Sequence, residues 1–176
     1  AQIEGLASAQ IQTWPGKQTD LAAVLAPIGI RLPERQAFTE ADGRLCGHIA
    51  PGRYLVLSED TIAIVVAAVP GALGAVADLS HARAGVRISG PNVETLMAKA
   101  AAIDFSVAGF PPGRLAQTSI HHMGCLVLRR AEDVFDLFVP TSFAVSFADW
   151  LTDAAREYGW RAEAPAGLQI GAAAGA

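Results

Sequence analysis

One pattern of strand-like and helix-like segments occurs twice in this chain of 176 residues. An alternating strand segment, a Pro/Gly break, a helix, a long link, a second strand and a second helix follow one another over residues 11–69 and again over residues 84–158. The best-matching pieces are residues 11–16 with 86–91, and residues 54–58 with 135–139. The alternative is a chance likeness of short βα units. We predict an α/β (α+β) fold, built from a duplicated strand-helix-strand-helix unit with helices packed on a mixed or antiparallel sheet.

The boundaries of this fold are predicted from length and local pattern. The chain has the size of one ordinary domain, so both copies are expected in a single domain over residues 1–165, followed by a low-complexity tail over residues 166–176. Residues 3–9 are expected to form a loose arm. Residues 33–52 are polar and are expected to form a long connection with at most short strands.

Two local signals predict where later elements begin and turn. Ser58 is expected to cap the helix that follows the strand at 53–57, with the acids Glu59 and Asp60 in its first turn. Residues 115–128 are expected to form a hairpin that turns near Met123 and Gly124.

Composition excludes several classes of function. The net charge is −4 and the thirteen Lys and Arg residues are scattered, unlike the basic patch of a nucleic-acid-binding protein. The longest apolar run, residues 62–69, is too short to span a bilayer. The two cysteines form no CxxC motif, which favours reduced thiols and a cytoplasmic protein. Apolar residues make up 52% and charged residues 17%, which reflects either alanine enrichment or a surface that a partner covers.

The clearest candidate for a metal site is the pair His121 and His122, with Cys125 three residues later. On a strand, adjacent histidines point to opposite faces, so they would not share one metal ion. Zinc needs three or four converging ligands, which Cys46 and His48 would have to complete. We therefore expect polar or interface histidines and no metal site.

Other candidate residues are weaker. Ser80 and His81 are sequence neighbours without a GxSxG motif, and Ser80 is expected to hydrogen-bond a strand end. The glycines match neither GxGxxG nor GxxxxGK[ST], and Gly90 is expected to permit a sharp turn from strand to helix. A solvated helix face accounts for three acids at a spacing of four, namely Asp149, Asp153 and Glu157. Arginines 83, 87 and 114 are either solubilising or placed to hold an anion or a partner's carboxylates.

Several short motifs, in order and spacing, carry a resemblance to a known family. They are residues 78–83 (Asp-Leu-Ser-His-Ala-Arg), 86–91 (Val-Arg-Ile-Ser-Gly-Pro), 110–114 (Phe-Pro-Pro-Gly-Arg), 116–118 (Ala-Gln-Thr), 135–140 (Phe-Asp-Leu-Phe-Val-Pro) and 142–147 (Ser-Phe-Ala-Val-Ser-Phe). With them, the chain resembles the gamma-subunit family of heterotetrameric sarcosine oxidases over residues 75–151, and a Trp-Pro-Gly motif at 14–16 adds support. That family is in turn similar to the front portion of the folate-binding aminomethyltransferases, whose folate-binding domain is a duplicated α/β unit.

The resemblance implies a role in a complex. Such an oxidase demethylates sarcosine to glycine, the methyl carbon leaves as formaldehyde or as methylene-tetrahydrofolate, and oxygen becomes hydrogen peroxide. Its FAD, FMN, NAD and tetrahydrofolate belong to the alpha and beta subunits and its zinc to the delta subunit. The gamma chain is implied to hold no cofactor, metal or catalytic residue and to pack against alpha, and through it to meet beta and delta. Four residues are expected at that interface: Arg83, Arg87, Phe110 and Arg114.

Two other functions stay open from the sequence. The first is a stand-alone folate-binding or one-carbon-transfer domain, in which Asp104 or Asp136 would hydrogen-bond the pteridine. The second is an unrelated regulatory binding module. A structural subunit is expected to self-associate when isolated, because the surface that meets its partner would be exposed.

Overall fold

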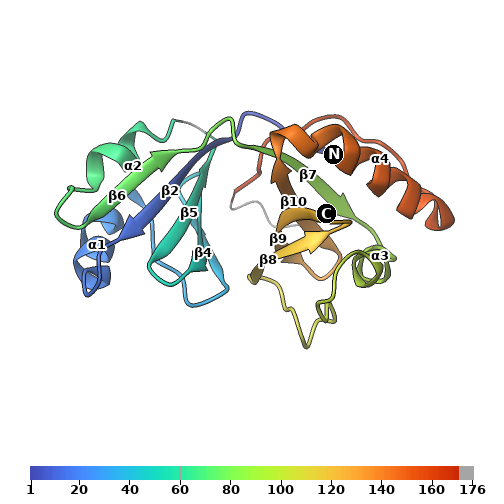
Figure 1. Ribbon diagram of the computed structural model, residues 1–176, viewed down its shortest axis with the longest axis horizontal. Helices are drawn as coiled ribbons and strands as arrows, with labels where there is room; N and C mark the ends of the chain where they lie inside the picture. The colour runs from blue at the N-terminus through green and yellow to red at the C-terminus, as the bar shows by residue number, and fades with distance from the viewer. Residues whose placement is uncertain (60, 171–176) are drawn as a thin grey trace. The chain divides into compact units, whose positions relative to one another are not determined.

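The computed structural model describes residues 1–59 and 61–170, which form two compact units (Figure 1). The N-terminal unit takes in Gly5–His81 with residues 167–170, and the C-terminal unit takes in Ala82–Ala166 with Ala1–Glu4. In the described residues, each unit contains one five-stranded antiparallel sheet and two α-helices. The predicted α/β class with helices packed on an antiparallel sheet is confirmed.

The N-terminal unit has the strand order β3-β4-β5-β2-β6. Its elements are β2 (Ala7–Thr13), α1 (Gln18–Leu25), the 3-10 turn Ala26–Ile28, β3 (Phe38–Ala41), β4 (Arg44–Ala50), β5 (Arg53–Ser58), α2 (Ala63–Ala68) and β6 (Gly74–Asp78). Both helices bury apolar side chains on one face of the sheet, Leu21 and Leu25 from α1 and Val65 from α2, against Ile11 and Val56. Gly29, at φ 77°, ends the first helical segment as the sequence predicts.

The C-terminal unit has the strand order β1-β7-β10-β9-β8. Its elements are β1 (Gln2–Ile3), β7 (Arg83–Ser89), α3 (Val93–Ala100), β8 (Leu115–Ile120), β9 (Met123–Ala131), β10 (Val134–Pro140), the 3-10 turn Thr141–Phe143, α4 (Ala144–Ala155) and a last 3-10 turn, Arg156–Tyr158. Leu96 and Met97 of α3 and Phe147 and Leu151 of α4 pack on the face of the sheet that carries Phe135. Because Phe147 and Leu151 are four residues apart, they lie on one side of their helix.

The two units share their order of elements. Strands β3-β4-β5-β2 of one sheet occupy the positions of β8-β9-β10-β7 in the other, and a helix follows β2 and β5 just as a helix follows β7 and β10. An internal duplication would produce this correspondence. The duplication itself, and a single domain over residues 1–165, stay predictions.

Two segments expected to lack regular structure contain strands. Residues 3–9 do not form a loose arm, because β1 pairs with β7 and β2 begins at Ala7. Residues 33–52 contain β3 and the seven-residue β4, so the long-connection prediction is wrong. Polar residues interrupt the alternating pattern of β4, and its pairing with β3 and β5 supplies the stabilisation that local pattern does not indicate.

The start of α2 also differs from the prediction. Ser58 is the last residue of β5, and α2 begins at Ala63, whose backbone N–H donates to Oγ1 of Thr61 at 3.1 Å. Residue 60 lies outside the described residues, as do residues 171–176 of the predicted tail.

The first part of the predicted tail makes specific contacts. Ala166 forms a parallel β-bridge with Ile3, and the backbone N–H of Gln169 donates to Oε1 of Glu59 at 2.5 Å. Each contact lies within one unit, so residues 166–170 have a defined place in the structure.

None of the helices in the described segments has both the length and the hydropathy needed to cross a bilayer.

Candidate functional site

Arg129, on β9, is the most fully satisfied polar side chain in the C-terminal unit. It is 0% exposed, and its guanidinium donates to the backbone oxygens of Phe105 (2.5 Å), Phe110 (3.0 Å), Ala131 (3.2 Å) and Glu132 and to a carboxylate oxygen of Glu94 (3.0 Å). An arginine has five N–H donors, so none is left over for a ligand. The guanidinium carbon also lies 4.9 Å from the ring centre of Phe135. Arg129 therefore binds the 101–114 loop to the sheet and has a structural role.

A second buried ionic group joins three strands of the same sheet. Asp136 on β10 is 0% exposed and receives two hydrogen bonds from Arg87 on β7, Nε to Oδ1 at 2.6 Å and Nη2 to Oδ2 at 2.7 Å. Arg130 on β9 places Nε 3.8 Å from Oδ2 of the same carboxylate. This bidentate geometry holds Arg87 in place for packing.

The four residues predicted at a partner interface differ in their surroundings. Arg87 is paired with Asp136, and Phe110 is only 6% exposed because it stacks in a cluster with Phe105 and Phe135. Arg83 and Arg114 are half-buried, and burial lowers the pKa of Arg83 from its ordinary value. A role of any of them at an interface stays a prediction.

His121 and His122 form the turn of the β8–β9 hairpin, where φ is 45° and 66°. The predicted turn at Met123 and Gly124 is therefore two residues too late. The argument that adjacent histidines lie on opposite strand faces fails as well, because these are turn residues whose ring centres are 5.8 Å apart. His121 stacks on Trp150 of α4, with ring centres 5.8 Å apart and planes 16° apart. Within residues 1–59 and 61–170, no three His, Cys, Asp or Glu side chains group as a metal ion would require.

Replacing His122 with glycine is expected to stabilise the chain by about 0.5–1 kcal/mol, because a two-residue turn with positive φ at both positions favours glycine at the second. Thermal unfolding should shift upward by about 1–4 °C. His121→Gly is the matched control: it relieves the same backbone strain but loses the ring stacking on Trp150, so it should give a smaller gain. An equal or larger gain for His121→Gly would contradict this explanation.

The two cysteines are buried core residues in different units. Desolvation raises the pKa of Cys46 and of Cys125 to about 12, and near Cys125 a hydrogen bond from Phe138 and the charge of Arg83 act in the opposite direction. Cys46 lies on β4 with His48, whose ring meets Tyr54 edge-on at 5.3 Å. Neither thiol is exposed enough to act as a nucleophile.

Both native thiols should therefore stay unreactive toward a disulfide reagent at pH 8, since the reactive thiolate forms only as pH rises toward about 12. In denaturant, where the pKa returns to its ordinary value, both should react at least about 100 times faster. Val145→Cys, at a position 75% exposed on α4, is the positive control and should react rapidly in the native state. Rapid native labelling of either wild-type cysteine would contradict the burial.

Ser80 does the structural work that the sequence predicts. Its Oγ accepts the backbone N–H of Ser8 at 3.2 Å, at the end of β2, and the backbone N–H of Ser80 donates to Oδ1 of Asp78 at 2.9 Å. The side-chain hydrogen bond from Ser80 is the largest cause that lowers the pKa of Asp78, followed by the backbone bond, with the charge of His81 adding to them. Asp78 is therefore a carboxylate at neutral pH.

The two candidate pterin ligands have other roles. Asp136 is enclosed by Arg87 and Arg130, so its carboxylate is not available to a ligand. Asp104 accepts the backbone N–H of Ser106 at 2.9 Å, which together with a side-chain bond lowers its pKa, and it lines a pocket of about 280 Å³. Ligand sites in proteins generally measure ~300–1,000 Å³, so this pocket lies just below that range.

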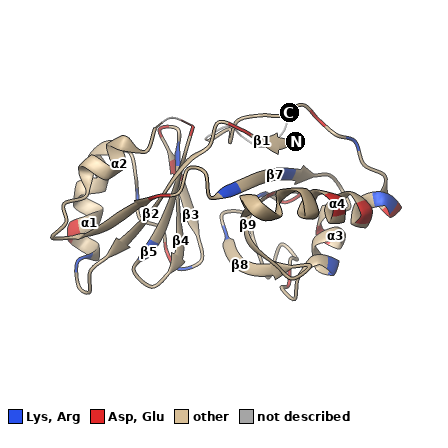
Figure 2. Ribbon diagram, turned by 45° about the horizontal axis from the view of Figure 1, so that its top comes forward, with Lys and Arg blue, Asp and Glu red and all other residues tan. Residues whose placement is uncertain are grey.

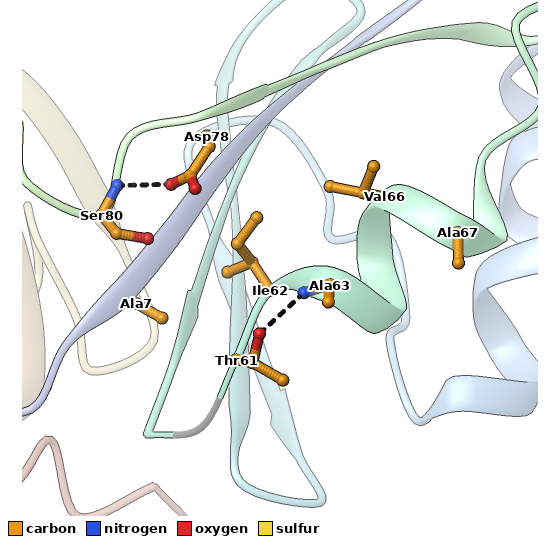
Figure 3. Close-up of a pocket in the computed structure, with 8 residues that line it drawn as sticks. All are labelled: Ala7, Thr61, Ile62, Ala63, Val66, Ala67, Asp78 and Ser80. Atoms are coloured by element: carbon orange, nitrogen blue, oxygen red, sulfur yellow. Dashed lines mark hydrogen bonds between the residues drawn. The ribbon is translucent and has the colours of Figure 1, made fainter.

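A larger pocket lies within the N-terminal unit, between α2 and the ends of β2 and β6 (Figure 3). Its volume is about 440 Å³ and it is open to solvent. We call it the α2 pocket, and it is lined by Ala7, Thr61, Ile62, Ala63, Val66, Ala67, Asp78 and Ser80. Asp78 is the charged residue among them. The polar groups of Thr61 and Ser80 already bond the backbone, which leaves an apolar floor beside one carboxylate.

The helix beside this pocket carries no charge. Lys, Arg, Asp and Glu are absent from residues 61–77. In Figure 2, α2 shows neither the blue of Lys and Arg nor the red of Asp and Glu, whereas α3 and α4 contain charged residues. Two large apolar side chains of α2 are exposed, Ile64 at 39% and Val66 at 47%. The apolar run at residues 62–69, which is too short to span a bilayer, is the sequence signal for this surface.

Comparisons with known proteins agree with each other. A model of the "Sarcosine oxidase, gamma subunit family" matches residues 18–157. The sarcosine oxidase subunit gamma of Corynebacterium sp. (strain U-96) is 29% identical over 152 residues, which cover 82% of this chain and 72% of that protein. The subunit gamma of an Arthrobacter species is 26% identical over 142 residues, covering 78% of this chain and 70% of that protein.

A solved structure shares the fold. It is the heterotetrameric sarcosine oxidase from Corynebacterium sp. U-96 in complex with pyrrole 2-carboxylate, which matches with a TM-score of 0.80 at 23% identity over 93% of this chain and 86% of the matched chain.

Proposed function

Because the chain belongs to the sarcosine oxidase gamma subunit family, we propose that it is a non-catalytic subunit of a heterotetrameric sarcosine oxidase and packs against the alpha subunit. The observation that carries the proposal is the match of the family model to residues 18–157, which extends through both units. In this proposal the complex oxidises sarcosine to glycine and releases hydrogen peroxide, while the flavins, NAD, tetrahydrofolate and zinc are held by other subunits in the cytoplasm.

The surroundings of the reactive side chains support a structural role. The buried ionic residues Arg129 and Asp136 are satisfied by neighbours in the same unit, and both thiols are buried with a raised pKa. Arg129 and Asp136 hold strands and a loop together, and the two thiols are enclosed in the cores of their units.

Co-expression with the alpha subunit of the same organism tests the proposal. A tagged alpha subunit should retain this chain at a stoichiometry of one to one through size-exclusion chromatography. The isolated chain should self-associate and should produce no hydrogen peroxide from sarcosine. A clean monomer that does not bind alpha, or an isolated chain that oxidises sarcosine, would overturn the proposal.

A further inference from the structure

We propose that the α2 pocket and the exposed side of α2 form the surface that binds the alpha subunit, and that the segment bound there is apolar and brings one basic side chain to Asp78. This inference rests on the proposed function, because it names the surface through which that function would operate. The α2 surface is defined here as the α2 pocket together with Ile64.

The first argument is the exposure of large apolar side chains on α2. Its sequence is Ala-Ile-Val-Val-Ala-Ala, and only Val65 is buried in the core of its own unit. Ile64 and Val66 stay 39% and 47% exposed. Monomeric proteins rarely expose a large contiguous apolar patch, and Val66 continues the apolar lining of the α2 pocket, with Ile62, Ala63 and Ala67, onto the surface.

The second argument is the contrast with the other helices. On α1, α3 and α4 the exposed positions include charged residues such as Asp20, Lys99 and Asp153, which make ion pairs at the surface. Such exposed ion pairs are typical of a helix surface that faces water. In contrast, α2 has no charged side chain at any position. Depletion of charge is the compositional mark of the centre of an interface.

The third argument is charge complementarity. Asp78 lies at the end of β6 and lines the apolar pocket, and it carries a negative charge at neutral pH. Asp78 already accepts hydrogen bonds from Ser80, but a neutral apolar segment would cover its negative charge without supplying an opposite charge, which costs free energy. A Lys or Arg side chain satisfies both halves of the pocket, because its aliphatic stem packs on Ile62 and Val66 while its head reaches the carboxylate.

The form of the surface favours a protein partner over a small molecule. The pocket is open, and Ile64 lies outside its lining, so a ligand that filled the pocket would leave Ile64 exposed. Because Ile64 and Val66 are two residues apart and lie on different sides of α2, only a partner that extends around the exposed side of the helix covers both. The occupant that fits this surface is therefore a segment of the alpha subunit with small and aliphatic side chains around one cationic residue.

Matched substitutions test this surface in the complete complex. Val66→Glu places a charge at the centre of the α2 surface and should weaken retention by tagged alpha at least tenfold. Val145→Glu is the control, since it makes the same change on an exposed position of α4 in the other unit and should leave retention within twofold. Asp78→Asn keeps the acceptor for the backbone N–H of Ser80 while it removes the charge, and it should weaken binding about threefold to tenfold and reduce its salt dependence.

A labelling experiment keeps the inference testable if Val66→Glu fails to fold. Ala63→Cys and Val145→Cys introduce thiols at exposed positions, whereas the native Cys46 and Cys125 are buried and should not react. Addition of the alpha subunit should slow maleimide labelling at position 63 at least tenfold and at position 145 less than twofold.

The outcomes separate this inference from the function on which it rests. Loss of binding in Val66→Glu together with protection at position 63 supports the surface. If wild-type chain does not bind alpha at all, the proposed function fails. If wild type and Val66→Glu bind alpha equally and position 63 is labelled at the same rate in the complex, the function stands and this surface is wrong. If Val66→Glu instead abolishes only self-association, the occupant is a second copy of this chain and the inference is overturned.

Discussion

Replacing Arg129 with methionine is expected to lower the free energy of unfolding by about 3–5 kcal/mol. Methionine fills a similar volume but donates no hydrogen bond. The backbone oxygens of Phe105, Phe110, Ala131 and Glu132 would lose this donor. The bonds to Phe105 and Phe110 are buried, and each buried acceptor left unsatisfied costs roughly 1–3 kcal/mol before relaxation.

Urea unfolding followed by circular dichroism measures this effect, and an unchanged dependence on urea concentration would show that only stability changed. Arg129→Lys should recover little, because one ammonium group cannot reach carbonyls on both sides of the 101–114 loop. The matched control is Arg161→Met, at a side chain 86% exposed, which should change stability by less than about 0.5 kcal/mol. A loss below about 1 kcal/mol in Arg129→Met would mean that the loop is not held by this side chain.

Asp136→Asn is expected to have the second largest effect, a loss of roughly 3 kcal/mol or more. The substitution keeps the size of the side chain but removes the negative charge that two arginines share. Arg87 would lose the carboxylate that it binds through two nitrogens, and Arg130, whose side chain is only 6% exposed, would lose its charge partner. Breaking a buried pair costs more than the pair itself contributes, because a buried charge is left uncompensated.

The control for Asp136→Asn is the same substitution at Asp133, which is exposed in the β9–β10 turn and should be nearly neutral. A thermal melt of both variants distinguishes the structural role from the alternative in which Asp136 binds a pteridine. If Asp136→Asn kept wild-type stability, the ionic group would not hold the sheet together and a ligand role for this carboxylate would regain interest.

The amino-acid sequence determined the class of this fold through local patterns. The short, mainly apolar runs that form β5 and β10 can be recognised from neighbouring residues alone, because such a run bounded by turn residues is typical of a buried strand. Likewise, the spacing of Phe147 and Leu151 is sufficient to predict the buried side of α4. Short motifs such as residues 86–91 and 135–140 indicate the family by their order and spacing, which can be read directly from the sequence.

Tertiary structure alone decided where the polar residues lie and what they bind. β4 is stabilised by strands on both sides, and Arg129 is buried because carbonyl groups from a loop 19 and 24 residues away converge on it. His121 and His122 were expected on a strand, on opposite faces, yet the pairing of β8 with β9 makes them the turn of the hairpin. Side-chain periodicity is visible in neighbouring residues, so the sequence predicts the helices and strands. Hydrogen bonds and burial between residues far apart in the chain leave no local pattern, so the sequence does not predict the partners of the polar groups.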